Sequence, residues 1–206
     1  KNVKRVLSID NYASNIHNCD VLLDFMNIEM DDSLDYIRDG KILNKDCKTF
    51  FGYDYTLLNP CFVDYKDEMK RRKLCKRHNS RNSLNSRKNI SNITILMGGA
   101  DTKSLTLKTI NLLSEYIWEN IISLTIIITG TNTNKDEILE LCQIKRYNVF
   151  VDVNNDDIPY LLSKTDLVIN TAGTSSFECC YMGIPCLTIC SSKFQMEHII
   201  NNFSKM

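Results

Sequence analysis

The strongest constraint on the fold is a regular alternation, from residue 92 onward, between short β-rich runs and helical patterns. The run at 124–129 reads LTIIIT and is rich in β-branched residues, as a strand buried on both faces should be. Between such runs, apolar residues recur at helical spacing. Strands that alternate with helices predict an α/β fold, with a parallel sheet covered by helices on both faces. We expect strands at 92–97, 124–129, 148–153, 166–170 and 185–190, and helices at 102–117, 135–144, 156–162, 175–182 and 194–203.

The first 65 residues hold fewer elements than the rest of the chain. They contain strand-like patterns at 3–9, 20–24 and 49–55, and the chain begins with Lys1. So few elements cannot easily bury a core by themselves. We therefore expect residues 1–65 to be the C-terminal part of a truncated first α/β domain.

Basic residues are concentrated between residues 66 and 90. This segment holds ten Lys or Arg and two acidic residues, a net charge of +8 in a chain whose formal net charge is zero. Such a segment is either a solvated linker or insertion, or a patch for nucleic acid or an acidic partner. Because it has no aromatic interleaving and no binding-fold signature, we favour the linker and expect no nucleic-acid partner.

The nine cysteines include no Cys-x-x-Cys pair, and several lie in apolar runs. This usage favours reduced, buried thiols over a disulfide framework or a metal site. No run reaches the roughly 20 apolar residues of a membrane span, and the N-terminus has no apolar core of a secretory signal. We therefore expect a cytoplasmic protein without a membrane span.

Two loops that follow strands are rich in small residues, at the place where parallel sheets bind ligands. In the first loop, Gly98 and Gly99 let the backbone approach a ligand closely, and the helix that follows favours an anion. Asp101 is either a ligand contact or a helix cap, and Thr102 or Ser104 could also cap that helix.

The second loop has the same strand, small-residue and helix order. Gly173, Thr174 and Ser175 supply backbone donors and hydroxyl groups at a helix N-terminus, which suits a diphosphate. Glu178 follows about one turn later, where its carboxylate could accept the two vicinal hydroxyls of a ribose. Alternatively, Glu178 is the second member of a capping box with Ser175.

The motifs around this second loop resemble the nucleotide-binding half of GT-B enzymes that act on UDP-sugars, the lipid II-forming N-acetylglucosaminyltransferases among them. These motifs are Asp166–Ile169, Ala172–Thr174, Glu178, Gly183–Pro185 and Gln195.

Over most of its length the chain is similar, more specifically, to the UDP-2,4-diacetamido-2,4,6-trideoxy-altropyranose hydrolases of pseudaminic acid biosynthesis and to their spore-coat polysaccharide relatives. The motifs that carry this likeness are Ile9–Asp10, Cys19–Asp24, Gly52–Pro60 and Met97–Asp101.

The resemblance implies a GT-B-like architecture in which residues 91–206 form a Rossmann-like nucleotide-sugar-binding domain. It implies a UDP-sugar substrate, with Glu178 at the ribose of UDP and Gln195 near the sugar or phosphate, and it requires no cofactor or metal. Seven further residues would lie near the phosphates or sugar: Gly98, Gly99 and Asp101 from the first loop, and Ala172, Gly173, Thr174 and Ser175 from the second.

The chain departs from the hydrolase pattern at several positions. Asn59 stands where the family has Arg, and Asn11 where it has an acidic residue. Family members also carry a glycine-rich loop with a catalytic histidine near their start, whereas here no glycine precedes Gly40. We expect all three histidines (His17, His78 and His198) to lie on the surface, and we therefore assign no catalytic residue.

Three functions fit these observations. The first is hydrolysis of a UDP-linked diacetamido-trideoxy sugar with release of UDP. The second is transfer of the sugar to an acceptor by a GT-B glycosyltransferase, since the same loops would bind the donor. The third is binding of a nucleotide sugar without catalysis. The oligomeric state is left open by the sequence.

Overall fold

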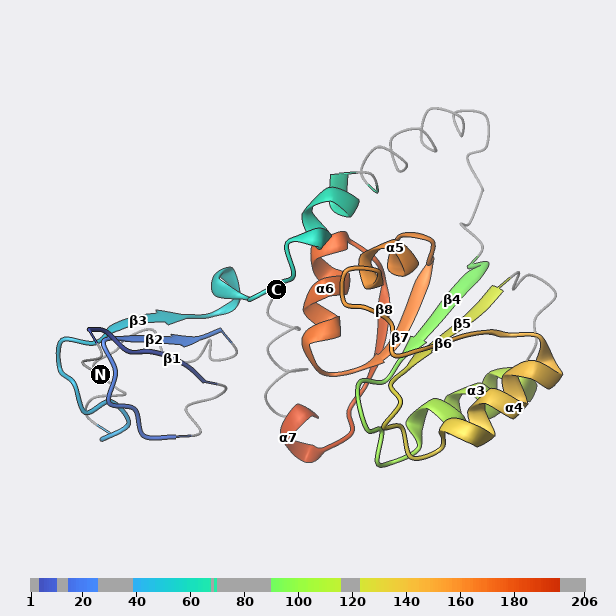
Figure 1. Cartoon of the computed structure of the whole chain (residues 1–206), viewed down its shortest axis with the longest axis horizontal. Helices are drawn as coiled ribbons and strands as arrows, with labels where there is room; N and C mark the ends of the chain where they lie inside the picture. The colour runs from blue at the N-terminus through green and yellow to red at the C-terminus, as the bar shows by residue number, and fades with distance from the viewer. Residues whose placement is uncertain are drawn as a thin grey trace. The chain divides into compact units, whose positions relative to one another are not determined.

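The computed structural model describes residues 4–10, 15–25, 39–67, 69, 90–115 and 123–196. They divide into two compact units, with the boundary between Leu57 and Leu58 (Figure 1). Each unit contains its own parallel sheet, and the two are described separately below.

The second unit is built on a five-stranded sheet in the order β6-β5-β4-β7-β8, in which every neighbouring pair is parallel. This confirms the predicted α/β fold with a parallel sheet. The strands are β4 (Asn92–Leu96), β5 (Ser123–Ile128), β6 (Asn148–Val151), β7 (Leu167–Thr171) and β8 (Cys186–Ile189).

Helices cover both faces of this sheet (Figure 1). On one face, Ile110 and Ile138 pack against buried residues of the central strands such as Ile95 and Ile126. On the other face, Leu162 packs with residues of the neighbouring helix and strands. The helices are α3 (Leu105–Glu115), α4 (Lys135–Lys145), α5 (Ile158–Ser163), α6 (Thr174–Met182) and α7 (Lys193–Gln195).

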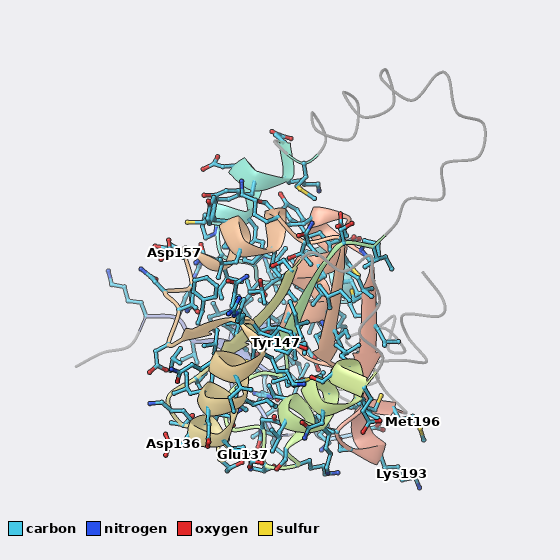
Figure 2. The ribbon with its side chains drawn as sticks, turned by 90° about the vertical axis from the view of Figure 1, so that its right-hand side faces the viewer. Asp136, Glu137, Tyr147, Asp157, Lys193 and Met196 are labelled. Carbon is cyan, nitrogen blue, oxygen red and sulfur yellow. The ribbon has the colours of Figure 1, made fainter. Side chains whose placement is uncertain are left out.

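Helix α4 is amphipathic, as expected of a helix that covers one face of a sheet. Asp136 and Glu137 lie on its outer side (Figure 2), while Ile138 and Cys142 are completely buried. None of the helices in the described part of the chain is both long and apolar enough to span a bilayer.

A helical segment at 61–67 also belongs to the second unit, although the sequence analysis placed residues up to 65 in the first domain. Its Phe62 is 1% exposed and packs with Leu162, Val168 and Cys179. Burial of this one aromatic side chain is the physical reason why the unit boundary precedes it. Most of the basic segment 66–90, and the last helix beyond Met196, lie outside the described residues.

The first unit contains a three-stranded parallel sheet in the order β1 (Leu7–Ile9), β2 (Val21–Asp24) and β3 (Lys48–Phe51). Among its described residues, one apolar core cluster contains four buried residues: Cys19, Leu22, Ile42 and Cys47.

The prediction of a strand over 49–55 is wrong at its C-terminal end. The strand stops at Phe51 because Gly52 has a φ of 90°, and residues Tyr53–Tyr55 form a short 3-10 helix, η1. The backbone N–H and the hydroxyl of Thr56 both donate to the Tyr53 carbonyl, at 3.0 and 2.7 Å, which closes this turn.

Candidate functional site

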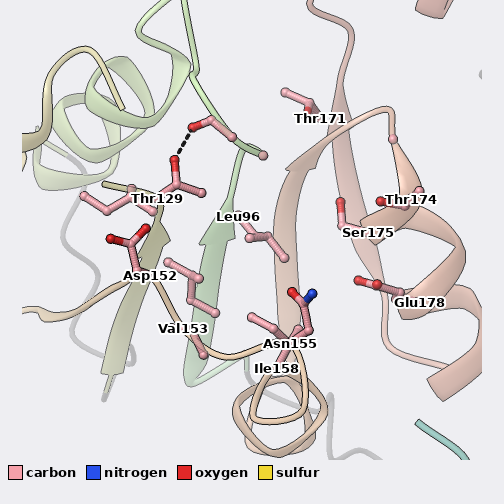
Figure 3. Close-up of a pocket in the computed structure, with 15 residues that line it drawn as sticks. Leu96, Thr129, Asp152, Val153, Asn155, Ile158, Thr171, Thr174, Ser175 and Glu178 are labelled. Carbon is pink, nitrogen blue, oxygen red and sulfur yellow. Dashed lines mark hydrogen bonds between the residues drawn. The ribbon is translucent and has the colours of Figure 1, made fainter. Parts of the chain in front are cut away.

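A cavity of about 400 Å³ lies in the second unit at the carboxyl ends of the strands (Figure 3). Polar side chains lie at its rim, and apolar side chains such as Leu96, Val153 and Ile158 form part of its wall. This is the position at which parallel sheets bind ligands. Its polar and glycine lining residues are Gly98, Gly99, Thr129, Asp152, Asn155, Thr171, Gly173, Thr174, Ser175 and Glu178.

The first glycine loop forms one side of this cavity. Gly98 has a φ of 81°, a conformation that favours glycine, and a Cβ there would lie 3.8 Å from Thr171 Oγ1. The loop is held by two threonines: Thr129 Oγ1 donates to the Gly99 carbonyl at 2.8 Å, and Thr171 Oγ1 donates to the Met97 carbonyl at 3.1 Å. The two predicted glycines therefore lie at the cavity in a fixed backbone conformation.

Asp101 caps a helix and does not line the cavity. Its two carboxylate oxygens accept the backbone N–H groups of Leu105 and Thr106, each at 2.8 Å. Of the two roles left open for Asp101, capping is the one that its contacts show. The Asp101 side chain therefore provides the cap for which Thr102 and Ser104 were also candidates.

The second glycine loop forms the opposite side of the cavity and leads into α6. Gly173 is the N-cap residue of α6, and no side chain caps that helix. Among the described residues, the backbone N–H groups of Thr174 and Ser175 have no hydrogen-bond partner. Because both residues line the cavity, two free donors and the positive end of the helix dipole lie there. Ala172, also a predicted site residue, is 1% exposed and does not line the cavity.

Glu178 lies half-buried on α6 and lines the same cavity (Figure 3). Burial raises the pKa of its carboxyl group above the usual value for glutamate, because desolvation disfavours the charged form. The capping-box alternative is not what the structure shows, because the N-cap residue is Gly173 and not Ser175. The Glu178 carboxylate accepts no hydrogen bond from another described residue, so it is available to a ligand.

Gln195 does not line the cavity. Its Oε1 accepts from the backbone N–H and the hydroxyl of Ser191, at 2.7 and 2.8 Å, and its own N–H donates to Ser192 Oγ. These contacts close the loop before α7. The approach of Gln195 to the sugar or phosphate, which the resemblance implies, stays a prediction.

Four polar residues of the cavity were not predicted: Thr129, Asp152, Asn155 and Thr171. Each lies at or just beyond the carboxyl end of a strand, so the rule that located the two glycine loops could have found them as well. Asp152 has a φ of 51°, and its carboxylate accepts the Gly130 N–H, which joins the ends of β5 and β6.

In the first unit, His17 is buried, which corrects the expectation of a surface histidine. It is 7% exposed, and its ring bonds Ser8 Oγ through Nδ1 at 2.9 Å and Asp10 Oδ2 through Nε2 at 2.7 Å. Asp10 also accepts the Asn15 N–H at 3.2 Å. Ser8 is the middle residue of β1 and Asp10 directly follows the strand, and this two-residue spacing was the signal that their side chains share one face. The other two histidines lie outside the described residues.

The described residues contain no group of three or more histidine, cysteine or acidic side chains that could hold a metal ion. The titratable residues that line the cavity are Asp152 and Glu178. The site can therefore offer backbone and hydroxyl donors together with the Glu178 carboxylate on the α6 side, the Asp152 carboxylate on the opposite side, and apolar side chains in the wall.

In the comparison with known proteins, no protein-family model matches this chain. The chain is 28% identical over 168 residues to a protein named "Uncharacterized protein MJ1062" from Methanocaldococcus jannaschii. The match covers 78% of this chain and 31% of the archaeal protein, so the chain corresponds to less than a third of the relative's length.

Proposed function

We propose that the cavity binds the UDP part of a nucleotide sugar, and that the chain belongs to a UDP-sugar hydrolase of GT-B architecture. One observation carries this proposal: Gly98, Gly99, the N-terminus of α6 and Glu178, which the sequence singled out separately, line one cavity. The resemblance to hydrolases of pseudaminic acid biosynthesis supplies the substrate class, a UDP-linked diacetamido-trideoxy sugar.

The chemistry of each wall supports a nucleoside diphosphate. The free N–H groups of Thr174 and Ser175 suit phosphate oxygens, and the α6 dipole favours negative charge at that end. Glu178 suits two neighbouring hydroxyl groups, which a ribose offers. The apolar side chains Leu96 and Val153 suit the flat face of a base.

In the proposed reaction, water attacks the anomeric carbon, the bond between this carbon and the diphosphate oxygen breaks, and UDP leaves with the electron pair. Donors held in place before the reaction stabilise the charge that develops on the leaving diphosphate. In the proposal, the N-terminus of α6 stabilises this charge on the diphosphate. The group that activates the water is not assigned to any residue of this chain.

A second candidate, nucleotide-sugar binding without catalysis, is favoured by the contacts of Asn59. This residue stands where the hydrolase pattern has an arginine. Its side chain makes two hydrogen bonds within the protein: Oδ1 accepts the Cys61 N–H at 3.0 Å, and Nδ2 donates to Asp156 at 2.9 Å. Asn59 therefore carries no positive charge and has its polar atoms engaged.

Turnover assays distinguish the candidates. UDP release from UDP-linked diacetamido-trideoxy sugars is measured with the full-length protein, with and without an acceptor alcohol. The proposed hydrolase releases UDP and free sugar at the same rate without an acceptor. Release that depends on an acceptor would indicate a glycosyltransferase instead, and binding without release would indicate the non-catalytic module.

A further inference from the structure

The polar side chains beneath the second glycine loop form one hydrogen-bonded network centred on Asn170. This residue lies in β7, and its side chain is completely buried. Its Oδ1 accepts from Thr188 Oγ1 of β8 at 2.9 Å. Its Nδ2 donates to Ser176 Oγ at 3.2 Å and to Ser175 Oγ at 3.4 Å. Asn170 therefore joins two strands to the first turn of α6.

The direction of each hydrogen bond in this network is fixed. Ser176 Oγ donates to the Thr171 carbonyl at 3.3 Å, and a carbonyl can only accept. Because the Ser176 proton is committed there, its oxygen must accept from Asn170, which orients the amide with Nδ2 toward α6. The other Nδ2 hydrogen is directed at Ser175 Oγ, so that oxygen also accepts. The hydroxyl proton of Ser175 is left free, and Ser175 lines the cavity.

We propose that Asn170 is a positioning residue that makes Ser175 a hydrogen-bond donor toward the cavity, and that this wall thereby selects an anionic oxygen acceptor. The inference rests on the proposed function, which places a nucleotide in the cavity. It adds that Ser175 donates a hydrogen bond to that ligand. The Ser175 hydroxyl joins the free N–H groups of Thr174 and Ser175, so this wall presents donors. Phosphate oxygens match such a wall, and a charged acceptor makes its hydrogen bonds stronger.

The inference predicts that an amide, and not a carboxylate of equal size, is needed at position 170. An ionised aspartate only accepts hydrogen bonds. In an Asn170→Asp variant, Ser175 would donate into the protein and turn its lone pairs toward the cavity. The buried charge would also lie close to the phosphates. Both effects weaken the binding of an anion, and neither concerns the base or the ribose.

The test is a set of calorimetric titrations of the whole chain with UDP, inorganic pyrophosphate and uridine. We expect Ser175→Ala and Asn170→Asp each to weaken UDP and pyrophosphate binding about tenfold or more, because each removes a donor to a charged group. Uridine carries no phosphate, so its affinity should stay unchanged. Because the donor effect of Asn170 acts through Ser175, the double variant should be less impaired than the product of the two single effects predicts, and only the charge effect of Asn170→Asp should add to that of Ser175→Ala.

The matched control is Asn148→Asp, the same substitution at an exposed Asn–Ser pair on β6, where Nδ2 donates to Ser123 Oγ at 3.0 Å. This variant should leave all three affinities unchanged. If circular dichroism shows that Asn170→Asp does not fold, Thr188→Val replaces it. That variant removes the donor that holds Oδ1, and it should weaken UDP several-fold without affecting uridine.

The outcomes separate the inference from the proposed function. UDP affinity that is unchanged in Ser175→Ala, or two single effects that simply multiply in the double variant, would overturn the inference alone. Wild-type chain that binds pyrophosphate but neither UDP nor uridine would reject the nucleotide proposal, while loss of pyrophosphate binding in Ser175→Ala would still support the donor wall. Wild-type chain that binds none of the three overturns both.

Discussion

The two units use the same parallel sheet architecture but fill their interiors differently. The second unit buries its strands under helices on both faces, and its larger core cluster contains ten buried residues. In the described part of the first unit, the apolar cluster contains four buried residues, and His17, Asp10 and Asp24 are buried beside them. On its β1 strand, Leu7 and Ile9 are 61% and 55% exposed.

The two units therefore differ in the interactions that stabilise them. In the second unit, apolar burial dominates, although polar groups such as Thr94 and Asn170 are also buried there and hydrogen-bonded. In the first unit, buried polar groups must satisfy one another, because an unpaired one would cost about 1–3 kcal/mol. Substitutions in the two units should therefore have different consequences.

The largest effect is expected from Ile126→Ala. Ile126 is completely buried between α-helical and strand neighbours in the larger core cluster, and removing its side chain leaves a cavity that should cost about 2–5 kcal/mol. Ile9→Ala in the first unit is the matched control and should change stability by less than about 0.5 kcal/mol, because Ile9 is more than half exposed. Chemical denaturation measures both, and equal losses would contradict the comparison.

The next effect is expected from His17→Ala in the first unit. This change removes the partner of both Ser8 and Asp10 and should cost about 1–3 kcal/mol, because it leaves a buried carboxylate without its ring contact. Ser8→Ala removes one neutral contact and should cost less. Hydrogen exchange of β2 amides reads the loss locally, and unchanged protection in His17→Ala would show that the cluster is not needed for stability.

A smaller effect, about 0.5–2 kcal/mol, is expected from Asn59→Ala, because the side chain accepts the Cys61 N–H at the start of the 61–67 helix. This variant tests whether the 61–67 segment belongs to the second unit. Protection from hydrogen exchange should fall in the 61–67 segment and in α5, because Asp156, which Asn59 contacts, lies just before α5. It should stay unchanged in β2. Asn59→Ser keeps a capping oxygen and should recover most of the loss.

The smallest effect is a pH dependence carried by Glu178. Its pKa is raised by burial in the folded chain, so the folded state holds this proton more tightly than the unfolded state. Its contribution to stability is therefore complete below the unfolded pKa and is lost as pH rises through the folded pKa. Glu178→Gln should flatten this slope in thermal unfolding between acidic and neutral pH. A wild-type slope of opposite sign in this region, unaltered by the substitution, would contradict the assignment.

The sequence predicted the second unit well because its strands are buried on both faces, which leaves continuous apolar runs such as 124–129. The same regularity located Gly98, Gly99 and Glu178, since a parallel sheet places its loops at one edge. Gln195 and Asp101 were less predictable. Both have polar side chains that suit a ligand as well as a local turn, and local contacts with Ser191 and with the start of α3 decided the outcome.

The first unit was less predictable for a related reason. A histidine in an irregular polar stretch has no periodic signal, so nothing local indicated that His17 would be buried between Ser8 and Asp10. The end of β3 was missed because the aromatic residues of 53–55 favour strands, whereas the positive φ of Gly52 turns the chain away from the sheet.

The central claim, that the cavity holds UDP with Glu178 at the ribose, is tested most directly by calorimetric titration of the chain with UDP. We predict binding at sub-millimolar concentration that weakens as pH falls through the raised pKa of Glu178, because the ribose hydroxyls need the carboxylate. Glu178→Ala should lose about 1–3 kcal/mol of affinity, whereas Glu140→Ala, on the exposed side of α4, should lose none. Absence of binding at millimolar UDP, or equal affinity in the two variants, would contradict the account.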